Sequence, residues 1–240
     1  MGSVATHKYD ESTIETLSAL EHIRRRPGMY IGRLGTGNHI DDGIYILLKE
    51  VIDNSIDEFI MGYGKKIVVL RAENEVRIRD YGRGIPLGKV VECVSIINTG
   101  AKYNDEVFQF SVGLNGVGTK AVNALSSYFK VTSYRDGKYF SATFEQGKQI
   151  EEKSGKTKEK NGTEVIFIPD AEAFGEYRFE EEFIISRLRS YSYLNRGLAL
   201  EYNGRTFRSN RGLLDLLNRE IDGDELYPFM HHQGTHLEFS

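Results

Sequence analysis

One long helical pattern constrains the fold of this 240-residue chain more than any other feature. Between residues 44 and 59, apolar side chains recur every three or four positions, and a pair of glycines marks the end of the helix. Two short β-prone runs, 66–71 and 75–80, follow at once and are joined by a tight turn. This order predicts a helical layer packed against a sheet.

Helices and strands are both plentiful in the rest of the chain, but they do not alternate as repeated βαβ units. The charged stretch 151–161 has almost no apolar residues, and we interpret it as a solvated connection between strands. The pattern therefore predicts an α+β sandwich, in which helices cover one face of a mixed sheet. Further helices are expected near 14–26, 88–98, 117–127, 179–195 and 211–219, and strands near 128–135, 138–146, 163–169 and on either side of Asn203-Gly204.

Composition places the chain among cytoplasmic globular proteins. With 40% hydrophobic residues it can bury a full core as one large domain. A net charge of −4, with no block of five basic residues, argues against an extended surface that follows nucleic-acid phosphates. The single cysteine, Cys93, excludes an internal disulfide, and no apolar run approaches the roughly 20 residues that cross a bilayer. We expect a polar arm over 1–13, one domain over 14–225, and in 226–240 the start of a connection to a further domain.

The long helix carries a polar face formed by Glu50, Asn54 and Asp57, which are spaced by four and three residues. A carboxylate and a carboxamide one turn apart can serve two purposes. Glu50 can take a proton from a water molecule, and Asn54 can offer a carbonyl oxygen to Mg²⁺. The alternative is an ordinary solvated helix face.

The run from Asp80 to Pro86 follows directly on a predicted strand and reads Asp-Tyr-Gly-Arg-Gly-Ile-Pro. Its glycines leave room for a flat ring to approach the backbone, and Asp80 can accept a hydrogen bond from an exocyclic amine. The alternative is a simple turn.

A third feature, Gly113-Leu114-Asn115-Gly116-Val117-Gly118-Thr119-Lys120, lies at the entrance to a predicted helix. Closely spaced glycines at such a place expose backbone N–H groups to an anion, and phosphate is the natural ligand. The glycine order differs from G-x-G-x-x-G, and the chain has no Walker sequence, so both familiar nucleotide-binding folds are disfavoured. The alternative is a flexible surface loop.

Taken in this order, the three features resemble the nucleotide-binding motifs of the GHKL ATPases, which include gyrase, Hsp90 chaperones, sensor histidine kinases and MutL. The run from Arg24 to Gly32, Arg-Arg-Arg-Pro-Gly-Met-Tyr-Ile-Gly, resembles a preamble peculiar to the B subunits of gyrase and topoisomerase IV. The resemblance extends from about Tyr9 to the last residue. It implies the Bergerat ATPase fold and a type II DNA topoisomerase, which uses ATP and Mg²⁺ to drive subunit dimerisation and DNA strand passage.

The resemblance also implies a role for each matched residue. Glu50 would be the catalytic general base, Asn54 the Mg²⁺ ligand and Asp80 the acceptor of the adenine amine. Thr163 would support the adenine site, which Gly84 and Ile85 line, and Glu58 and Arg83 would form an ion pair beside it. Also assigned to the nucleotide site are Asp57, Pro86, Lys102 and a phosphate loop of Gly113, Leu114, Asn115, Gly116, Val117 and Gly118.

Three residues depart from the family pattern. Tyr81 replaces an Asn or Asp, Phe108 replaces a tyrosine that donates to phosphate, and Asn115 replaces the histidine of gyrase. Phe108 cannot donate a hydrogen bond, so we expect redistributed phosphate contacts. Asn115, together with a shorter linker over 86–100, favours the topoisomerase IV branch over the gyrase branch.

The implied partners are a second copy of this B-type chain, the DNA-cleaving A-type subunit and, in the full enzyme, DNA; no membrane is implied. Tyr9 and Ile14 match the family's dimer-contact residues, although Ile14 also suits burial in a helix. The domain expected to follow would supply a lysine to the γ-phosphate, so we expect this chain alone to be monomeric and slow in hydrolysis. Two alternatives are an ATP-gated dimerisation module with incidental hydrolysis and an Hsp90-like or histidine-kinase ATPase, but the latter lack the preamble.

Overall fold

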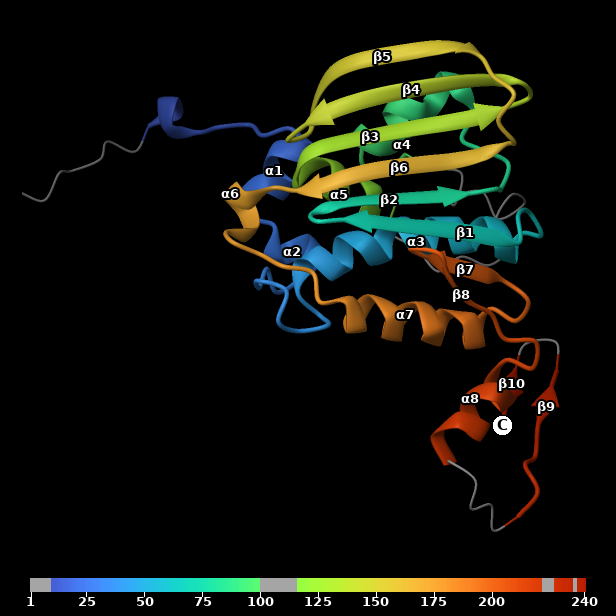
Figure 1. Cartoon of the computed structure of the whole chain (residues 1–240). Coiled ribbons are helices and arrows are strands. Elements are labelled where there is room, and N and C mark those ends of the chain that lie inside the picture. Colours follow the sequence, from blue (N-terminus) through green and yellow to red (C-terminus); the bar gives the residue numbers. More distant parts are fainter. Residues whose placement is uncertain (1–9, 100–115, 222–226, 235–236) are drawn as a thin grey trace, which may run out of the picture.

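The computed structural model describes residues 10–99, 116–221, 227–234 and 237–240. Its main feature is an eight-stranded mixed sheet (Figure 1) in which only β1 and β7 are parallel neighbours. Across the sheet the order is β5 (Lys148–Lys156), β4 (Lys138–Glu145), β3 (Ser126–Arg135), β6 (Gly162–Pro169), β2 (Glu75–Asp80), β1 (Lys66–Ala72), β7 (Ala199–Tyr202) and β8 (Arg205–Phe207).

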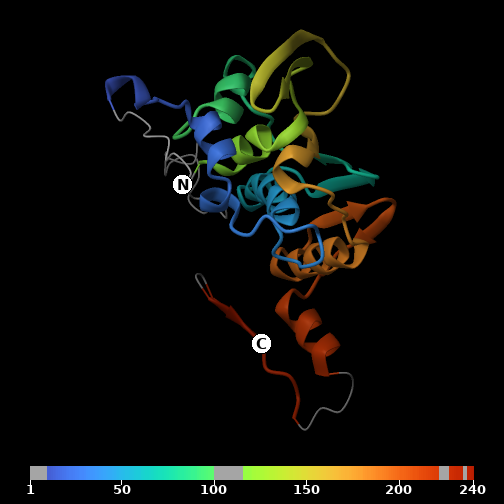
Figure 2. The same ribbon diagram turned by 90° about the vertical axis from the view of Figure 1, so that its left-hand side faces the viewer.

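Helices cover one face of this sheet, as the view from the side shows (Figure 2). The described elements in this layer are α1 (Ala19–Arg25), α2 (Gly28–Ile31), α3 (Gly43–Ile60), η2 (Leu87–Lys89), α4 (Val90–Ser95), α5 (Gly118–Ala124) and α7 (Glu181–Leu194). The short η1 (Glu11–Thr13) precedes them, and α6 (Ala171–Phe174) follows β6. The predicted α+β sandwich is confirmed.

The core forms where α3 packs against the strands β1 and β2. Leu48 and Ile52 of α3 are fully buried, and so are the inward-facing Val69 of β1 and Val76 of β2. The alternation of buried and exposed positions along β1 and β2 leaves one face of the hairpin for α3. Because α3 also contacts α5, its polar residues come to lie between the two helices.

Two predicted elements differ in the structure. The helix expected from Ile14 begins at Ala19, because Ser18 and Glu21 form a capping box in which each side chain binds the other residue's backbone N–H. Ile14 is therefore outside a helix and 69% exposed, so the interpretation of Ile14 as a buried helix residue is wrong. Gly28 begins α2, which is not among the helices expected from the sequence.

The charged stretch expected as a connection is largely a strand. β5 pairs with β4 at the edge of the sheet, and all its side chains are exposed. A strand with no buried face shows no alternation of apolar and polar residues, so the pattern could not reveal it. Only the residues after Lys156 form the connection to β6.

The last elements are α8 (Leu213–Ile221), β9 (His232–Gln233) and β10 (Glu238–Phe239), which lie beyond the end of α7 in both views (Figures 1 and 2). The N-terminus of α8 is tied down by Ser209, whose hydroxyl contacts Asp215 Oδ2 at 2.7 Å and accepts from Gly212 N at 2.8 Å. The domain limits at 13 and 225 stay predictions. Among the described residues, no helix has the length and apolar character to span a membrane.

Candidate nucleotide site

α3 brings the expected general base, Glu50, and the expected Mg²⁺ ligand, Asn54, to the start of α5. Asn54 Nδ2 donates to the backbone oxygen of Glu50 at 2.7 Å and to Thr119 Oγ1 at 2.9 Å. These bonds fix the amide plane of Asn54, and they give Oδ1 the role of acceptor. A carbonyl oxygen held in this way is a suitable ligand for Mg²⁺.

Gly118 lies directly against the carboxylate of Glu50. A Cβ atom on Gly118 would come within 1.8 Å of Glu50 Oε2, so a larger residue at this position would displace the Glu50 carboxylate. Gly116 has a φ of +62°, a conformation that glycine adopts without strain. These two glycines of the third motif therefore have separate functions. Gly116 allows a turn with a positive φ, and Gly118 allows a close contact with Glu50.

Asp80, at the end of β2, is a buried carboxylate with one oxygen already bonded. Oδ1 accepts from the backbone N–H groups of Gly82 at 2.9 Å and Thr163 at 3.1 Å. In the described part of the chain, Oδ2 receives no hydrogen bond. Burial raises the pKa of Asp80 to about 6, while the two backbone donors and the nearby Arg79 act in the opposite direction. Oδ2 is thus an acceptor suited to an amine ligand.

Two glycines let the backbone close in around Asp80. Gly84 has a φ of +75°, and a Cβ there would meet the carbonyl oxygen of Tyr134 at 2.6 Å. Gly162 has a φ of +138°, and its Cβ would lie 2.3 Å from the carbonyl oxygen of Asp80. The hydroxyl of Ser133 donates to the Ile85 carbonyl at 2.6 Å, which ties the motif to β3. Any larger residue at either glycine would displace this backbone.

Glu58 and Arg83 form the predicted ion pair. Arg83 Nη2 donates to Glu58 Oε1 at 2.9 Å, while the side-chain Nε and the backbone N–H of Arg83 both donate to Oε2, at 3.1 and 2.9 Å. The hydrogen bonds to Glu58 raise the pKa of Arg83. The Arg83 guanidinium also lies over the ring of Tyr63, 4.5 Å from its centre. This pair fastens the second motif to the end of α3.

Arg79 is part of the site's framework and was not predicted from the sequence. Its guanidinium lies between two rings, 4.8 Å from the centre of Tyr81 and 4.5 Å from that of Tyr134. It also donates to the carbonyl oxygens of Asp80 and, at 2.6 Å, Lys160. Tyr81, one of the three departures from the family pattern, therefore packs on the Arg79 guanidinium, which in turn holds the backbone of Asp80. The sequence signal for this arrangement is an arginine and two tyrosines near the ends of predicted strands.

The remaining predicted residues divide into described and undescribed ones. Asp57 is fully buried on α3, Pro86 directly precedes η2, and Val117 precedes α5. The assignments of Tyr9, Lys102, Gly113, Leu114 and Asn115, and the departure at Phe108, lie outside the described residues. Those residue roles stay predictions.

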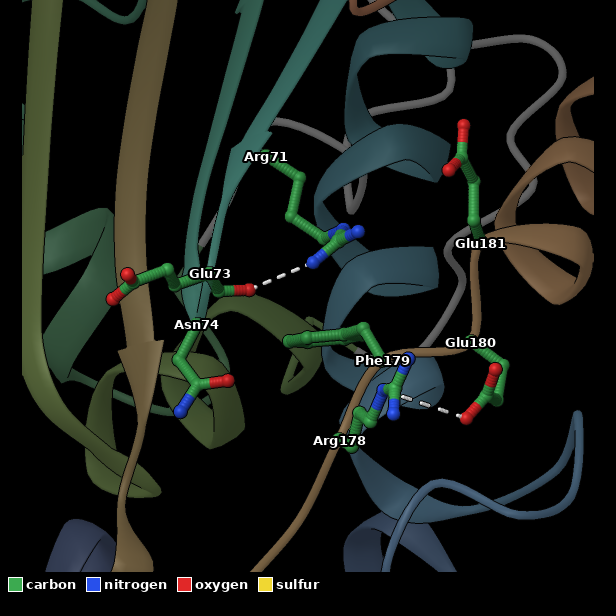
Figure 3. Close-up of a pocket in the computed structure, with 7 residues that line it drawn as sticks. All are labelled: Arg71, Glu73, Asn74, Arg178, Phe179, Glu180 and Glu181. Atoms are coloured by element: carbon green, nitrogen blue, oxygen red, sulfur yellow. Dashed lines mark hydrogen bonds and ion pairs between the residues drawn. The ribbon is translucent and has the colours of Figure 1, made fainter.

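A cavity of about 290 Å³ lies at the other end of β2 from Asp80, beside the β1–β2 turn (Figure 3). Two contacts join residues of its lining: Arg71 Nη1 donates to the carbonyl oxygen of Glu73 at 2.9 Å, and Arg178 Nε lies 3.7 Å from Glu180 Oε1. None of the predicted site residues that the structure describes lines it. The lining residues are Arg71, Glu73, Asn74, Arg178, Phe179, Glu180 and Glu181.

Comparison with known proteins identifies the class to which this fold and site belong. Residues 39–173 match the family described as "Histidine kinase-, DNA gyrase B-, and HSP90-like ATPase". The match covers more than half of the chain, and the chain belongs to this ATPase family.

Individual relatives are more specific. The chain is 61% identical over 236 residues to the B subunit of DNA topoisomerase 4 from Borreliella burgdorferi, which covers 98% of this chain and 39% of that protein. It is 37% identical over 225 residues to the B subunit of DNA gyrase from Thermotoga maritima, covering 87% of this chain and 34% of that protein. The crystal structure of the 43K ATPase domain of Thermus thermophilus gyrase B, solved with an aminocoumarin, matches with a TM-score of 0.75 and 32% identity over 92% of this chain and 61% of that chain.

These matches confirm the predicted resemblance to the gyrase and topoisomerase IV B subunits and the GHKL fold. The chain spans about two fifths of the length of the first relative and a third of the second.

Proposed function

We propose that this chain is the ATP-binding and ATP-hydrolysing domain of a type II DNA topoisomerase, within its B-type subunit, and that Mg²⁺ accompanies the nucleotide. One arrangement carries the proposal: Glu50, Asn54 and Gly118 meet between α3 and α5, while Asp80 offers a buried acceptor at the end of β2. An acid–base group, a metal ligand and an amine acceptor are the parts that ATP hydrolysis requires.

In this proposal each residue has one task. Asp80 Oδ2 accepts a hydrogen bond from the adenine amine, and Glu50 takes a proton from the attacking water. Asn54 Oδ1 would hold Mg²⁺, which would supply positive charge to the phosphate oxygens. The backbone N–H groups of Gly116 and Gly118, at the entrance to α5, would donate to the phosphates.

The wider function follows from the relatives. The named relatives are B-type subunits of topoisomerases, and we propose that ATP drives dimerisation of this subunit and DNA strand passage together with an A-type, DNA-cleaving subunit in the cytoplasm. The 61% identity supports topoisomerase IV over gyrase. Ile14, exposed and outside a helix, is available for the predicted contact with a second copy.

The test separates binding from chemistry. Glu50→Ala should retain ATP affinity within a few-fold by calorimetry, while the hydrolysis rate falls at least ~100-fold, because a general base contributes about 10²–10⁴ to the rate. Glu92→Ala is the matched control. It removes an exposed carboxylate of α4 that is paired with Lys89, and this variant should hydrolyse ATP normally. Equal losses of affinity and rate in Glu50→Ala would contradict the assignment.

A further inference from the structure

A buried polar cluster joins α3 to α7 beside Glu50, and the proposed mechanism does not use it. Its centre is Asp53, which is 1% exposed. Lys49 Nζ donates to Asp53 Oδ2 at 2.5 Å, and the hydroxyl of Tyr191 on α7 donates to Oδ1. Burial and the neighbouring Asp53 charge raise the pKa of Tyr191, so its hydroxyl keeps its proton and remains the donor.

Lys49 is placed between two carboxylates. Its Nζ lies 4.0 Å from Glu50 Oε1, and its side chain is only 34% exposed. Lys49 and Asp53 are one turn apart on the same side of α3, whereas Glu50 lies about 100° further round the helix. The bond to Asp53 keeps the flexible lysine side chain from swinging into solvent, and the ammonium stays beside the general base.

The other carboxylate oxygen of Glu50 is confined as well. Gly118 approaches its carboxylate so closely that a Cβ would lie 1.8 Å from Oε2. The carboxylate is thus held between the backbone of α5 and the ammonium of Lys49. A group that must aim one oxygen at a water molecule benefits from such confinement, because small misplacements reduce the rate strongly.

We propose that Lys49 is a positioning residue for hydrolysis: anchored by Asp53, its ammonium holds the Glu50 carboxylate in place and offsets the repulsion between that carboxylate and the bound triphosphate. The inference rests on the proposed role of Glu50 as general base. The carboxylate and the triphosphate are both anionic and must approach the same water molecule, so they repel each other. A cation 4.0 Å from Glu50 Oε1 reduces that repulsion.

Steady-state hydrolysis by this chain with ATP and Mg²⁺ tests the inference. Lys49→Met should lower kcat roughly tenfold and change KM less than twofold, because small misplacements of a catalytic group reduce the rate strongly while the nucleotide contacts stay in place. Lys49→Arg, which keeps the charge, should restore at least about half of the wild-type kcat. Lys89→Met is the control: Lys89 pairs with Glu92 at 2.8 Å, three residues apart at the start of α4, and its loss should leave kcat unchanged.

A purely structural role for Lys49 would lower stability without the kcat loss. If Lys49→Met does not fold, Lys49→Met/Asp53→Asn removes both charges and should show the same kcat loss. If Lys49→Met folds and keeps the wild-type kcat while Glu50→Ala is inactive, the inference is overturned but the proposed function is not. A change confined to KM, or no recovery with Lys49→Arg, also overturns it. Normal hydrolysis by Glu50→Ala overturns the proposed function and the inference with it.

Discussion

The substitution Asp80→Asn should stabilise the nucleotide-free protein while it weakens ATP binding. In the folded chain, burial raises the pKa of Asp80 from 3.8 to about 6, which means that the fold disfavours the ionised carboxylate. An asparagine keeps an oxygen that can accept from Gly82 and Thr163, and it carries no charge to bury. The substitution therefore removes a desolvation penalty without breaking the backbone contacts.

The size of this effect depends on pH. A carboxyl group whose pKa is higher in the folded than in the unfolded state destabilises the fold once it ionises. For Asp80 this cost is absent below pH 3.8, grows as the pH rises and is complete above pH 6. The interval between the two pKa values corresponds to about 3 kcal/mol, which is an upper limit on the gain in unfolding free energy at pH 8. At pH 5 the gain should be roughly half as large.

Chemical denaturation of wild type and Asp80→Asn at pH 8 and pH 5 measures both values. In parallel, calorimetry should show ATP affinity reduced about 10- to 100-fold, because the asparagine N–H₂ group would face the adenine amine and leave a donor unpaired. Thr143→Val, which changes a buried polar side chain on β4, serves as a control for general effects of core substitution. Lower stability of Asp80→Asn at pH 8, or a gain equal at both pH values, would refute the burial argument.

Two further substitutions probe the contacts of the site. Gly118→Ala should keep the fold, since alanine favours a helix, but should displace Glu50 and lower kcat at least ~10-fold in hydrolysis assays; a normal rate would mean that the carboxylate position is unimportant. Arg83→Met should lower the unfolding free energy by about 1–3 kcal/mol in denaturation experiments, because it leaves Glu58 without its bidentate partner. Arg83→Lys should recover only part of that loss, and full recovery would show that the fork geometry has no role.

The sequence predicted those parts of the fold in which hydrophobic period and local chemistry agree. α3 and the β1–β2 hairpin have one buried face each, and both were predicted at nearly their observed limits. β5 has no buried face, so its existence depends only on backbone pairing with β4, which leaves no mark on side-chain choice. α1 begins later than its apolar spacing indicates, because the Ser18–Glu21 capping box fixes its first turn.

The candidate site likewise contains residues that the sequence predicts and contacts that it does not. Polar residues and glycines in apolar surroundings mark Glu50, Asn54 and Asp80 as candidates, and the resemblance to the GHKL ATPases gives them their roles. The structure adds why the glycines are there, since Gly118 and Gly84 face atoms that any side chain would strike. Contacts between residues far apart in sequence, such as Tyr191 with Asp53 across 138 positions, could not be read from spacing.

The preamble from Arg24 to Gly32 signalled the family, and the structure gives it a physical purpose. Arg24 Nη1 donates to the backbone oxygen of Ala124 at 2.8 Å and lies 2.8 Å from the buried Asp170 Oδ2. Ala124 is the last residue of α5, so this arginine neutralises the carbonyl end of that helix and joins it to the end of β6. The opposite end of α5 is Gly118, packed on Glu50. Because α5 has only seven residues, a contact that fixes its last turn also limits the movement of its first, and the preamble supports the geometry at the general base without approaching it.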